Sequence, residues 1–310
     1  MNNQPIIHVG YPKAASTTLQ CNLFFEHSEI NYLSVKGPTH KENFQVDENI
    51  RKFYKHLVKL NGIEYHCSNT RNFFNDVIKK YMSSEKRNLF SHECLINQGR
   101  LDNALRAYRL KEIFPNAKII IVLRNQVNMA ISMYDMFPFI ELGNELRYIT
   151  FYQWLEMKFK YPDHNLLGGL KYYEIVKFYK QLFGENNVEV FLFEELSNNM
   201  ENFAQKMSDF INIDANETKH LLANKPANTA KSNYVHNLRR KLIPGIQFSN
   251  FLPPKTHKYL LNKLTEIVPS KKSVMSQYHV DKMHETYGLS NRKLMDEFGL
   301  DVARYNYPLI

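Results

Sequence analysis

The sequence has few cysteines and no long apolar segment. Its three cysteines, Cys21, Cys67 and Cys94, lie far apart and form no C-x-x-C pair. Such a sparse, odd set argues against a disulfide framework and a zinc site, and it favours a reducing compartment. No run approaches the ~18 apolar residues that a membrane span requires, and no basic segment followed by an apolar one precedes the first apolar run at Pro5. We therefore expect a soluble, cytoplasmic protein without a membrane span.

The chain also lacks internal repeats, low-complexity linkers and a dense basic stripe. With 310 residues, 44% of them hydrophobic, it can bury a sizeable core, and we expect one domain over residues 1–310. The net charge of +9 favours anionic partners such as a nucleotide or an anionic glycan. The basic residues are scattered, and the clusters are Arg239, Arg240 and Lys241, and Lys271 with Lys272. Because a nucleic-acid-binding surface more often carries a continuous basic patch, we expect no nucleic acid partner.

Short apolar runs alternate with helical patterns along the chain. We predict strands at residues 6–9, 88–93, 117–123 and 188–193, with the β-branched run 117–123 in the middle of the sheet. Strands that alternate with helices imply a parallel sheet with right-handed crossovers. The predicted fold class is therefore α/β, with three layers around a central parallel sheet.

The segment PIIHVGYPKAASTTLQ, residues 5–20, has the pattern of a strand, a tight loop and a helix. The apolar run ends at Gly10, the loop contains Lys13, and we expect a helix over about residues 16–27. A helix N-terminus offers free N–H groups and partial positive charge to an anion. Lys13 would add a full charge, and the hydroxyls of Ser16 and Thr17 would add donors. We predict a phosphate cradle that differs from a Walker loop, because no second glycine precedes the lysine. The alternative is an ordinary turn whose hydroxyls cap the helix.

A second basic residue follows the most apolar strand. Arg124 comes directly after residues 117–123, and Ser132 lies eight residues further on, inside the next predicted helix. Ligands collect at the carboxyl ends of parallel strands, so we expect Arg124 and Lys13 at the same edge of the sheet. A guanidinium binds phosphate through a bidentate fork, and a serine hydroxyl can add a contact. The alternative is an arginine that closes the strand and a serine that faces solvent.

Together these two motifs resemble the donor-binding motifs of the sulfotransferase family. The family's 5′-phosphosulfate loop is usually Tyr-Pro-Lys, a small residue, Gly, then Thr-Thr, and its 3′-phosphate site is an Arg-x7-Ser pattern like that of Arg124 and Ser132. Ala15 stands where the family most often has glycine, and we expect it to take an ordinary φ and to displace the loop slightly. The resemblance implies a P-loop-like fold and the donor 3′-phosphoadenosine 5′-phosphosulfate (PAPS), with no metal. The residues that resemble the loop are Tyr11, Pro12, Lys13, Ala14, Ala15, Ser16, Thr17 and Thr18.

The resemblance also implies a catalytic base near the end of the predicted strand 88–93. An acceptor hydroxyl must lose a proton as it attacks sulfur, and a cation must stabilise the departing 5′-phosphate, which is the role we expect for Lys13. Family members use histidine or glutamate near this point, and the strand-end Ser-x-Glu pattern of the glycan and tyrosine branches is similar to Ser91-His92-Glu93. Because side chains alternate along a strand, only one of His92 and Glu93 is expected to face the site. We predict Glu93 as the base and keep His92 as the alternative; an ordinary polar strand end is the third interpretation.

Weaker resemblances continue toward the C-terminus. Residues 193–196 (FEEL) are similar to the family's aromatic-Glu-Asp-Leu segment. Arg239 and Arg240 lie where family members close a basic loop over the donor's 3′-phosphate, although the spacing departs from the Arg-Lys-Gly signature of the cytosolic enzymes. The acceptor does not follow from the motifs; a glutamate base, a basic surface and many aromatic residues favour a glycan or another hydroxylated metabolite. The oligomeric state does not follow from the sequence.

Two other functions fit parts of the pattern. A P-loop-type small-molecule kinase would use ATP and Mg²⁺ and would need an aspartate at a strand end to hold the metal, whereas the central strand ends in Arg124. A non-catalytic nucleotide- or glycan-binding protein on the same scaffold would be compatible with Ala15 and with the open choice of base. The joint occurrence of two anion-binding motifs favours the sulfotransferase.

Overall fold

A computed structural model describes residues 4–37, 46–96, 103–136, 139–142, 145–162, 165–223 and 273–310. Arg239 and Arg240, the predicted contacts of the 3′-phosphate, lie outside these ranges. Helices and strands alternate along most of the described chain, and five parallel strands form its central sheet. The predicted α/β fold class is confirmed.

The central sheet has the strand order β2-β3-β1-β4-β7, and all of its neighbouring strands run parallel. Strand β1 pairs with both β3 and β4, and its Ile6 lies opposite Leu89 on one side and Lys118 on the other. The four predicted strands are present, and β2 is an additional strand that the sequence pattern did not indicate. The bounds are β1 Ile6–His8, β2 Ile30–Ser34, β3 Arg87–Ser91, β4 Lys118–Leu123 and β7 Val188–Leu192.

Helices alternate with the strands of the central sheet in the described ranges, as the predicted α/β pattern requires. The helices are α1 Ser16–Thr18, α2 Glu48–Val58, α3 Cys67–Asp76, α4 Asn103–Ile113, α5 Gln126–Met136, α6 Phe151–Lys160, α7 Tyr172–Phe183, α8 Phe193–Asn198, α9 Met200–Ile211, α10 Ala215–Ala223 and α13 Gln277–Phe298. A π-helical segment, η1, covers Leu19–Phe24, and short 3₁₀ turns are η2 Ile78–Tyr81, η4 Gly168–Leu170, η5 Glu185–Asn187 and η7 Ala303–Tyr305.

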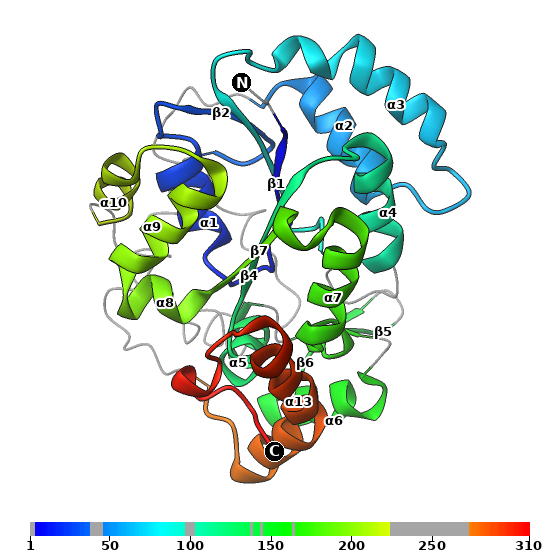
Figure 1. The fold of residues 1–310 in the computed structure, drawn as a ribbon. Helices are drawn as coiled ribbons and strands as arrows, with labels where there is room; N and C mark the ends of the chain where they lie inside the picture. The colour runs from blue at the N-terminus through cyan, green and yellow to red at the C-terminus, as the bar shows by residue number, and fades with distance from the viewer. Residues whose placement is uncertain are drawn as a thin grey trace, which may run out of the picture.

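The sheet lies between two layers of helices, as predicted. In Figure 1 the strands run through the middle of the molecule, with α1, α8, α9 and α10 on one side and α2, α3, α4 and α7 on the other. Residues 119–123 of β4 are fully buried, which is the expected state of a strand covered on both faces. Burial of each such side chain stabilises the fold by about 1.5–3 kcal/mol relative to exposure. The hydrophobic effect therefore favours an interior position for β4, which lies between β1 and β7, whereas β1 is the middle strand.

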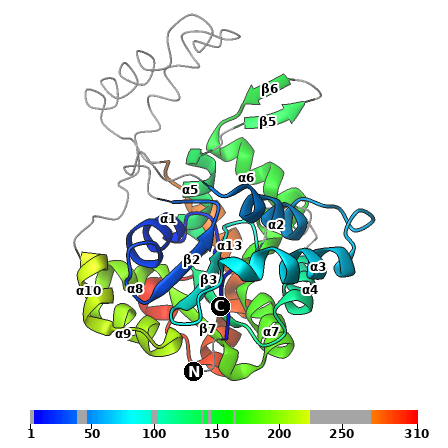
Figure 2. The same cartoon turned by 90° about the horizontal axis from the view of Figure 1, so that it is seen from above.

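A two-stranded antiparallel hairpin was not predicted. It consists of β5 Phe139–Leu142 and β6 Glu145–Tyr148, in a region whose sequence suggested a loop. Figure 2 shows that this hairpin extends away from the central sheet and its helices. Its strands pair only with each other among the described residues and are not part of the central sheet.

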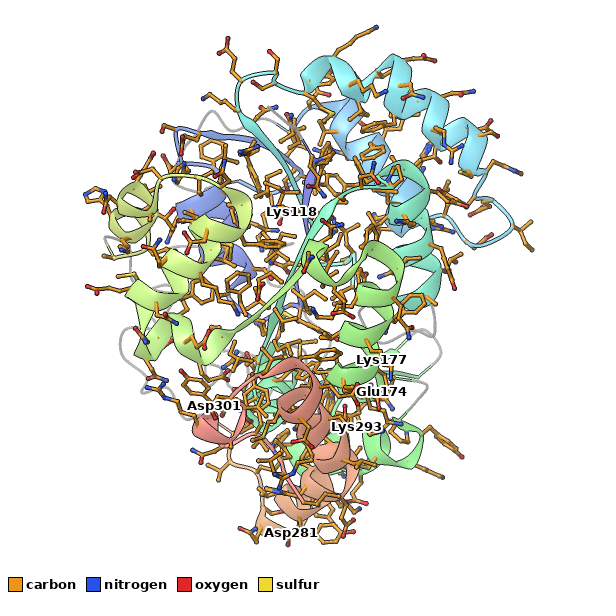
Figure 3. All side chains as sticks on the ribbon, in the orientation of Figure 1. Lys118, Glu174, Lys177, Asp281, Lys293 and Asp301 are labelled. Carbon is orange, nitrogen blue, oxygen red and sulfur yellow. The ribbon has the colours of Figure 1, made fainter. Side chains whose placement is uncertain are left out.

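The long helix α13 packs against α7 and α5 on the outside of the fold. Figure 3 shows the side chains of Glu174 and Lys177 on α7 close to Lys293 on α13, and Ser290 of α13 donates a hydrogen bond to Glu174 at 2.8 Å. Ser276 caps the start of α13, and Gly299, with φ of 65°, ends it in a left-handed conformation. No helix of the described ranges is long and apolar enough to cross a membrane.

Candidate active site

The carboxyl ends of four neighbouring strands bring the candidate residues together. Lys13 follows β1, Arg124 follows β4, Glu93 follows β3, and Lys36 follows β2. Because all of these strands are parallel and adjacent, their ends meet at one edge of the sheet. The predicted common edge for Lys13 and Arg124 is therefore confirmed, and Lys36 is a residue that the sequence analysis did not select.

The loop after β1 has an unusual backbone. Lys13 and Ala15 have φ of 68° and 59°, the left-handed region, whereas Ala14 between them has a negative φ. The expectation that Ala15 takes an ordinary φ is therefore wrong; the tight turn into α1 imposes the conformation that glycine would adopt freely. Left-handed residues in a tight turn can direct backbone N–H groups toward an anion. The Ala14 N–H, however, donates to the carbonyl of Tyr11 at 3.3 Å. The phosphate cradle stays a prediction.

Two side chains of the loop form hydrogen bonds with backbone carbonyls and so stabilise its conformation. Tyr11 is buried, and its hydroxyl donates to the carbonyl of Gly169 at 2.8 Å. Ser16 is also buried, and its hydroxyl donates to the carbonyl of Tyr11 at 2.8 Å. Gly10 has φ of 27°, and a Cβ there would lie only 2.8 Å from Cε1 of His8, so no larger residue fits. These contacts hold the loop in one shape before any ligand arrives.

The helix after the loop differs from the regular one that was predicted over residues 16–27. Only Ser16–Thr18 is α-helical, and Leu19–Phe24 is π-helical. Three apolar residues of this segment, Leu19, Leu23 and Phe24, are fully buried. The wider π turn is a feature often found at functional sites. Thr17 at the helix start is only partly buried, and Thr18 is buried.

Arg124 is in direct contact with the loop. Its Nη1 donates to the carbonyl oxygen of Lys13 at 2.6 Å, and its guanidinium carbon lies 4.5 Å from the centre of the Phe193 ring. Its Nε is buried and has no hydrogen-bond partner among the described residues. Burial lowers the pKa of Arg124, opposed by the charge of Glu194. Ser132 lies on α5, the helix that begins two residues after Arg124, and is partly exposed.

The residue after Arg124 is held by the C-terminal tail, an interaction that local sequence patterns could not indicate. Asn125 caps α5 through a hydrogen bond from the Val127 N–H at 2.9 Å, and its Nδ2 donates to the carbonyl of Asn306 at 2.6 Å. The Asn125 N–H and the Tyr307 hydroxyl both donate to the carboxylate of Glu194, each at 2.9 Å. Burial raises the pKa of Glu194, and these two hydrogen bonds oppose the shift. The tail therefore braces the end of β4.

Glu93 is paired with a lysine. The Nζ of Lys36 contacts a carboxylate oxygen of Glu93 and donates to Oγ1 of Thr17 at 2.9 Å. Burial lowers the pKa of Lys13; the charge of Glu93 opposes this shift, and the positive charges of Arg124 and Lys36 add to it. The four charged groups are thus close enough to influence one another. Lys36 was missed because β2 was missed; a lysine just after a strand of this sheet would have been a candidate.

His92 has a different environment from Glu93. Strand β3 ends at Ser91, so both residues lie beyond it and the expected strand alternation does not apply to them. The His92 ring lies 5.1 Å from the ring of Tyr54, and its Nδ1 accepts a hydrogen bond from the Cys94 N–H at 3.0 Å. Burial lowers the pKa of His92 to about 4. Its ring is therefore neutral near pH 7, with the proton on Nε2.

A buried polar cluster lies beneath the loop. Nδ1 of His8 is hydrogen-bonded to Oγ of Ser91 at 2.7 Å, and Gln20 donates to the same oxygen at 2.9 Å. Burial lowers the pKa of His8 to about 3, and its Nε2 has no partner among the described residues. This cluster ties β1, β3 and η1 together directly below the cradle. No group of three or more His, Cys, Asp or Glu side chains that could hold a metal ion occurs in the described ranges.

Comparison with known proteins identifies the family. The sequence profile of the family described as Sulfotransferase domain matches residues 3–299. The chain belongs to the sulfotransferase family. The resemblance of the two motifs is thereby confirmed. No curated protein sequence matches the chain.

Solved structures with a similar fold are also sulfotransferases. A sulfotransferase from Alicyclobacillus acidocaldarius is 16% identical, with a TM-score of 0.53, and the match covers 97% of this chain and 98% of that one. Mouse sulfotransferase SULT7A1 complexed with PAP is 17% identical, with a TM-score of 0.44 and coverage of 90% and 88%. The sulfotransferase domain of the Synechococcus PCC 7002 olefin synthase is 11% identical, with a TM-score of 0.42 and coverage of 96% and 95%. The first of these shows a shared fold.

Proposed function

We propose that this sulfotransferase uses PAPS to sulfate a hydroxyl group of its acceptor. The observation that carries the proposal is the contact between the two predicted anion anchors, in which Nη1 of Arg124 donates to the carbonyl of Lys13 at 2.6 Å. One nucleotide with two phosphate-bearing ends can then engage the cradle and the arginine together. The family assignment over residues 3–299 supports the same reaction class.

The residues at the edge fit an anionic nucleotide. A loop with left-handed residues can present backbone N–H groups to the proposed 5′-phosphosulfate, and Lys13 within it supplies a cation. The unpartnered Nε of Arg124 is a buried donor that lacks an acceptor among the described residues, and the donor's 3′-phosphate would supply one. Ser132 is the proposed additional contact of that phosphate. Arg239 and Arg240, which lie outside the described ranges, are further predicted contacts of the 3′-phosphate.

The proposed reaction assigns separate tasks to Lys13 and Glu93. Bound PAPS supplies an activated sulfuryl group, whose S–O bond to the 5′-phosphate breaks as the acceptor oxygen bonds to sulfur. Glu93 takes the proton that the acceptor hydroxyl loses. Lys13 stabilises the negative charge that collects on the departing phosphate oxygen. The products are a sulfate ester, adenosine 3′,5′-bisphosphate (PAP) and a proton on Glu93.

The environments of the two candidate bases favour Glu93. The Nδ1 lone pair of His92 already accepts a hydrogen bond from the Cys94 N–H, and Nε2 carries the ring proton. Glu93 instead contacts Lys36, whose Nζ also donates to Oγ1 of Thr17 in the proposed cradle. His92 is the alternative base.

The acceptor that we propose is a glycan or another hydroxylated metabolite. A net charge of +9 suits an anionic glycan, and a glutamate base resembles the glycan branch of the family. A single domain over residues 1–310, a cytoplasmic location and a reaction without metal are further proposals of the same kind.

Ligand-dependent thermal stability tests the proposed donor class. A ligand that binds only the native state raises the melting temperature of the protein. At a ligand concentration one hundred times the Kd, the free energy of unfolding increases by about 2.7 kcal/mol. We expect PAP to stabilise the protein more than ATP or 5′-AMP does at equal concentration, and Arg124→Ala to abolish that preference. Stabilisation by ATP with Mg²⁺ and none by PAP would instead favour the kinase.

Turnover separates the enzyme from a binding protein and tests the base. With labelled PAPS and a panel of glycans and hydroxylated metabolites, Glu93→Ala should retain PAP binding and lose turnover. His92→Gln is the matched variant at the neighbouring position and should retain turnover. Normal rates in Glu93→Ala would show that His92 or another group is the base. PAP binding without transfer to any acceptor would indicate a non-catalytic protein.

A further inference from the structure

We propose that Lys36 couples donor binding to the release of the catalytic base. In the free protein Lys36 holds Glu93 in an ion pair, and on donor binding its ammonium group contacts the sulfonate oxygens and leaves Glu93 able to accept the acceptor's proton. The inference deepens the proposed function and rests on it.

The position of Lys36 is the first support. It follows β2, which lies beside β3, and its Nζ reaches both Glu93 and Oγ1 of Thr17. Thr17 belongs to the proposed 5′-phosphosulfate cradle. An anion that binds to the Thr17 hydroxyl therefore comes within reach of the Lys36 ammonium, which has three N–H donors on a flexible stem.

The balance of charge is the second support. The positive charges of Arg124 and Lys36 add to the lowering of the Lys13 pKa that burial causes, and the carboxylates of Glu93 and Asp135 oppose it. A further anion at this point would favour the charged form of Lys13, as these carboxylates do. The donor's sulfonate supplies negative charge at the cradle, where Lys36 already has one of its two contacts.

The exposure of the pair is the third support. The side chains of Lys36 and Glu93 are 41% and 25% exposed. Partly exposed ion pairs contribute little to stability. The exchange of Glu93 for the donor's sulfonate as the partner of Lys36 should therefore change the stability of the fold little. A fully buried pair would resist this exchange, because its separation would leave a charge without a partner.

The exchange predicts a difference between two nucleotides. PAPS carries the sulfonate, and PAP does not. Lys36 should therefore contribute to the affinity for PAPS and hardly at all to that for PAP, whereas Arg124 should contribute to both. A merely structural lysine would change the two affinities together.

Equilibrium binding of both nucleotides without acceptor is the test. We expect Lys36→Met to weaken PAPS binding about tenfold, as loss of a charged hydrogen bond does, and to leave the Kd for PAP within about twofold of the wild-type value. Lys36→Arg retains the charge and should recover most of the PAPS affinity. Lys55→Met, an exposed position on α2, is the matched surface control and should change neither Kd.

The outcomes separate this inference from the proposed function. Equal weakening of PAP and PAPS in Lys36→Met, or no weakening of either, overturns the role of Lys36 while the donor class stands. Wild-type protein that binds neither nucleotide overturns the proposed function and this inference with it. If Lys36→Met melts well below the wild type, Lys36→Gln replaces it in the same comparison of the two nucleotides.

Discussion

Glycine at position 15 should stabilise this protein, although glycine in place of alanine usually destabilises. Ala15 has φ of 59° and ψ of 8° at the start of α1. A left-handed conformation costs an alanine roughly 1–2 kcal/mol that glycine does not pay. Two effects destabilise the glycine variant. The greater entropy of its unfolded chain costs about 0.4–1 kcal/mol, and it loses part of a methyl contact that is worth about 0.8 kcal/mol when fully buried. We expect Ala15→Gly to stabilise the fold by roughly 0.5 kcal/mol.

The neighbouring alanine is a matched control. Ala14 is fully buried and has a negative φ, so Ala14→Gly loses the methyl contact and gains no relief. We expect it to destabilise by about 1–2 kcal/mol. The contrast between the two variants, about 2 kcal/mol or ~5 °C in melting temperature, is measurable by urea and thermal unfolding. Equal destabilisation by both glycines would refute the left-handed conformation of Ala15.

Two other predictions concern groups around the site. Below pH 6.5 the unfolded chain takes up a proton that folded His8, with its pKa lowered to about 3 by burial, does not, so stability falls as the pH falls toward 3. At pH 5 the loss of stability from His8 is roughly 2 kcal/mol. His8→Gln should remove this loss when the free energy of unfolding by urea is compared at pH 7 and pH 5. The exposed control His66→Gln should keep the pH dependence of the wild type. Tyr307→Phe leaves one carboxylate oxygen of Glu194 without its donor and should cost about 1–3 kcal/mol. It should also weaken PAP binding several-fold, and an unchanged Kd would show that the tail does not position Arg124.

The strands that the sequence predicted are those whose local pattern matches their final burial. Residues 119–123 are apolar without interruption, and all five are fully buried in β4. Strand β2, with the sequence INYLS, has a mixed burial pattern at the edge of the sheet, so neither alternation nor a continuous apolar run marks it. Because the sequence pattern did not indicate β2, it did not mark Lys36 as a residue at a strand end.

The loop shows a different limit of local reasoning. Its residue types predicted a phosphate cradle, but the rule that alanine avoids positive φ gave the wrong conformation for Ala15. The loop is held by contacts distant in the chain, such as that of Tyr11 with Gly169, 158 residues away. Local propensity is a weak guide where tertiary hydrogen bonds over-determine the backbone. The brace of Asn125, Glu194 and Tyr307 was beyond sequence reasoning for the same reason.

The order of the strands in the sheet sets the order of the four charged residues along its edge. Neighbouring strands lie about 4.8 Å apart, and the order β2-β3-β1-β4 places Lys36, Glu93, Lys13 and Arg124 along the edge in that sequence. On the proposed roles, the donor's 3′-phosphate lies over β4 and its 5′-phosphosulfate over β1. The acceptor hydroxyl must then approach from the side of β3 and β2, because in-line attack requires it opposite the departing phosphate. The proposed base and Lys36 stand on that side, so the strand order, combined with these proposed roles, indicates the side from which the acceptor enters.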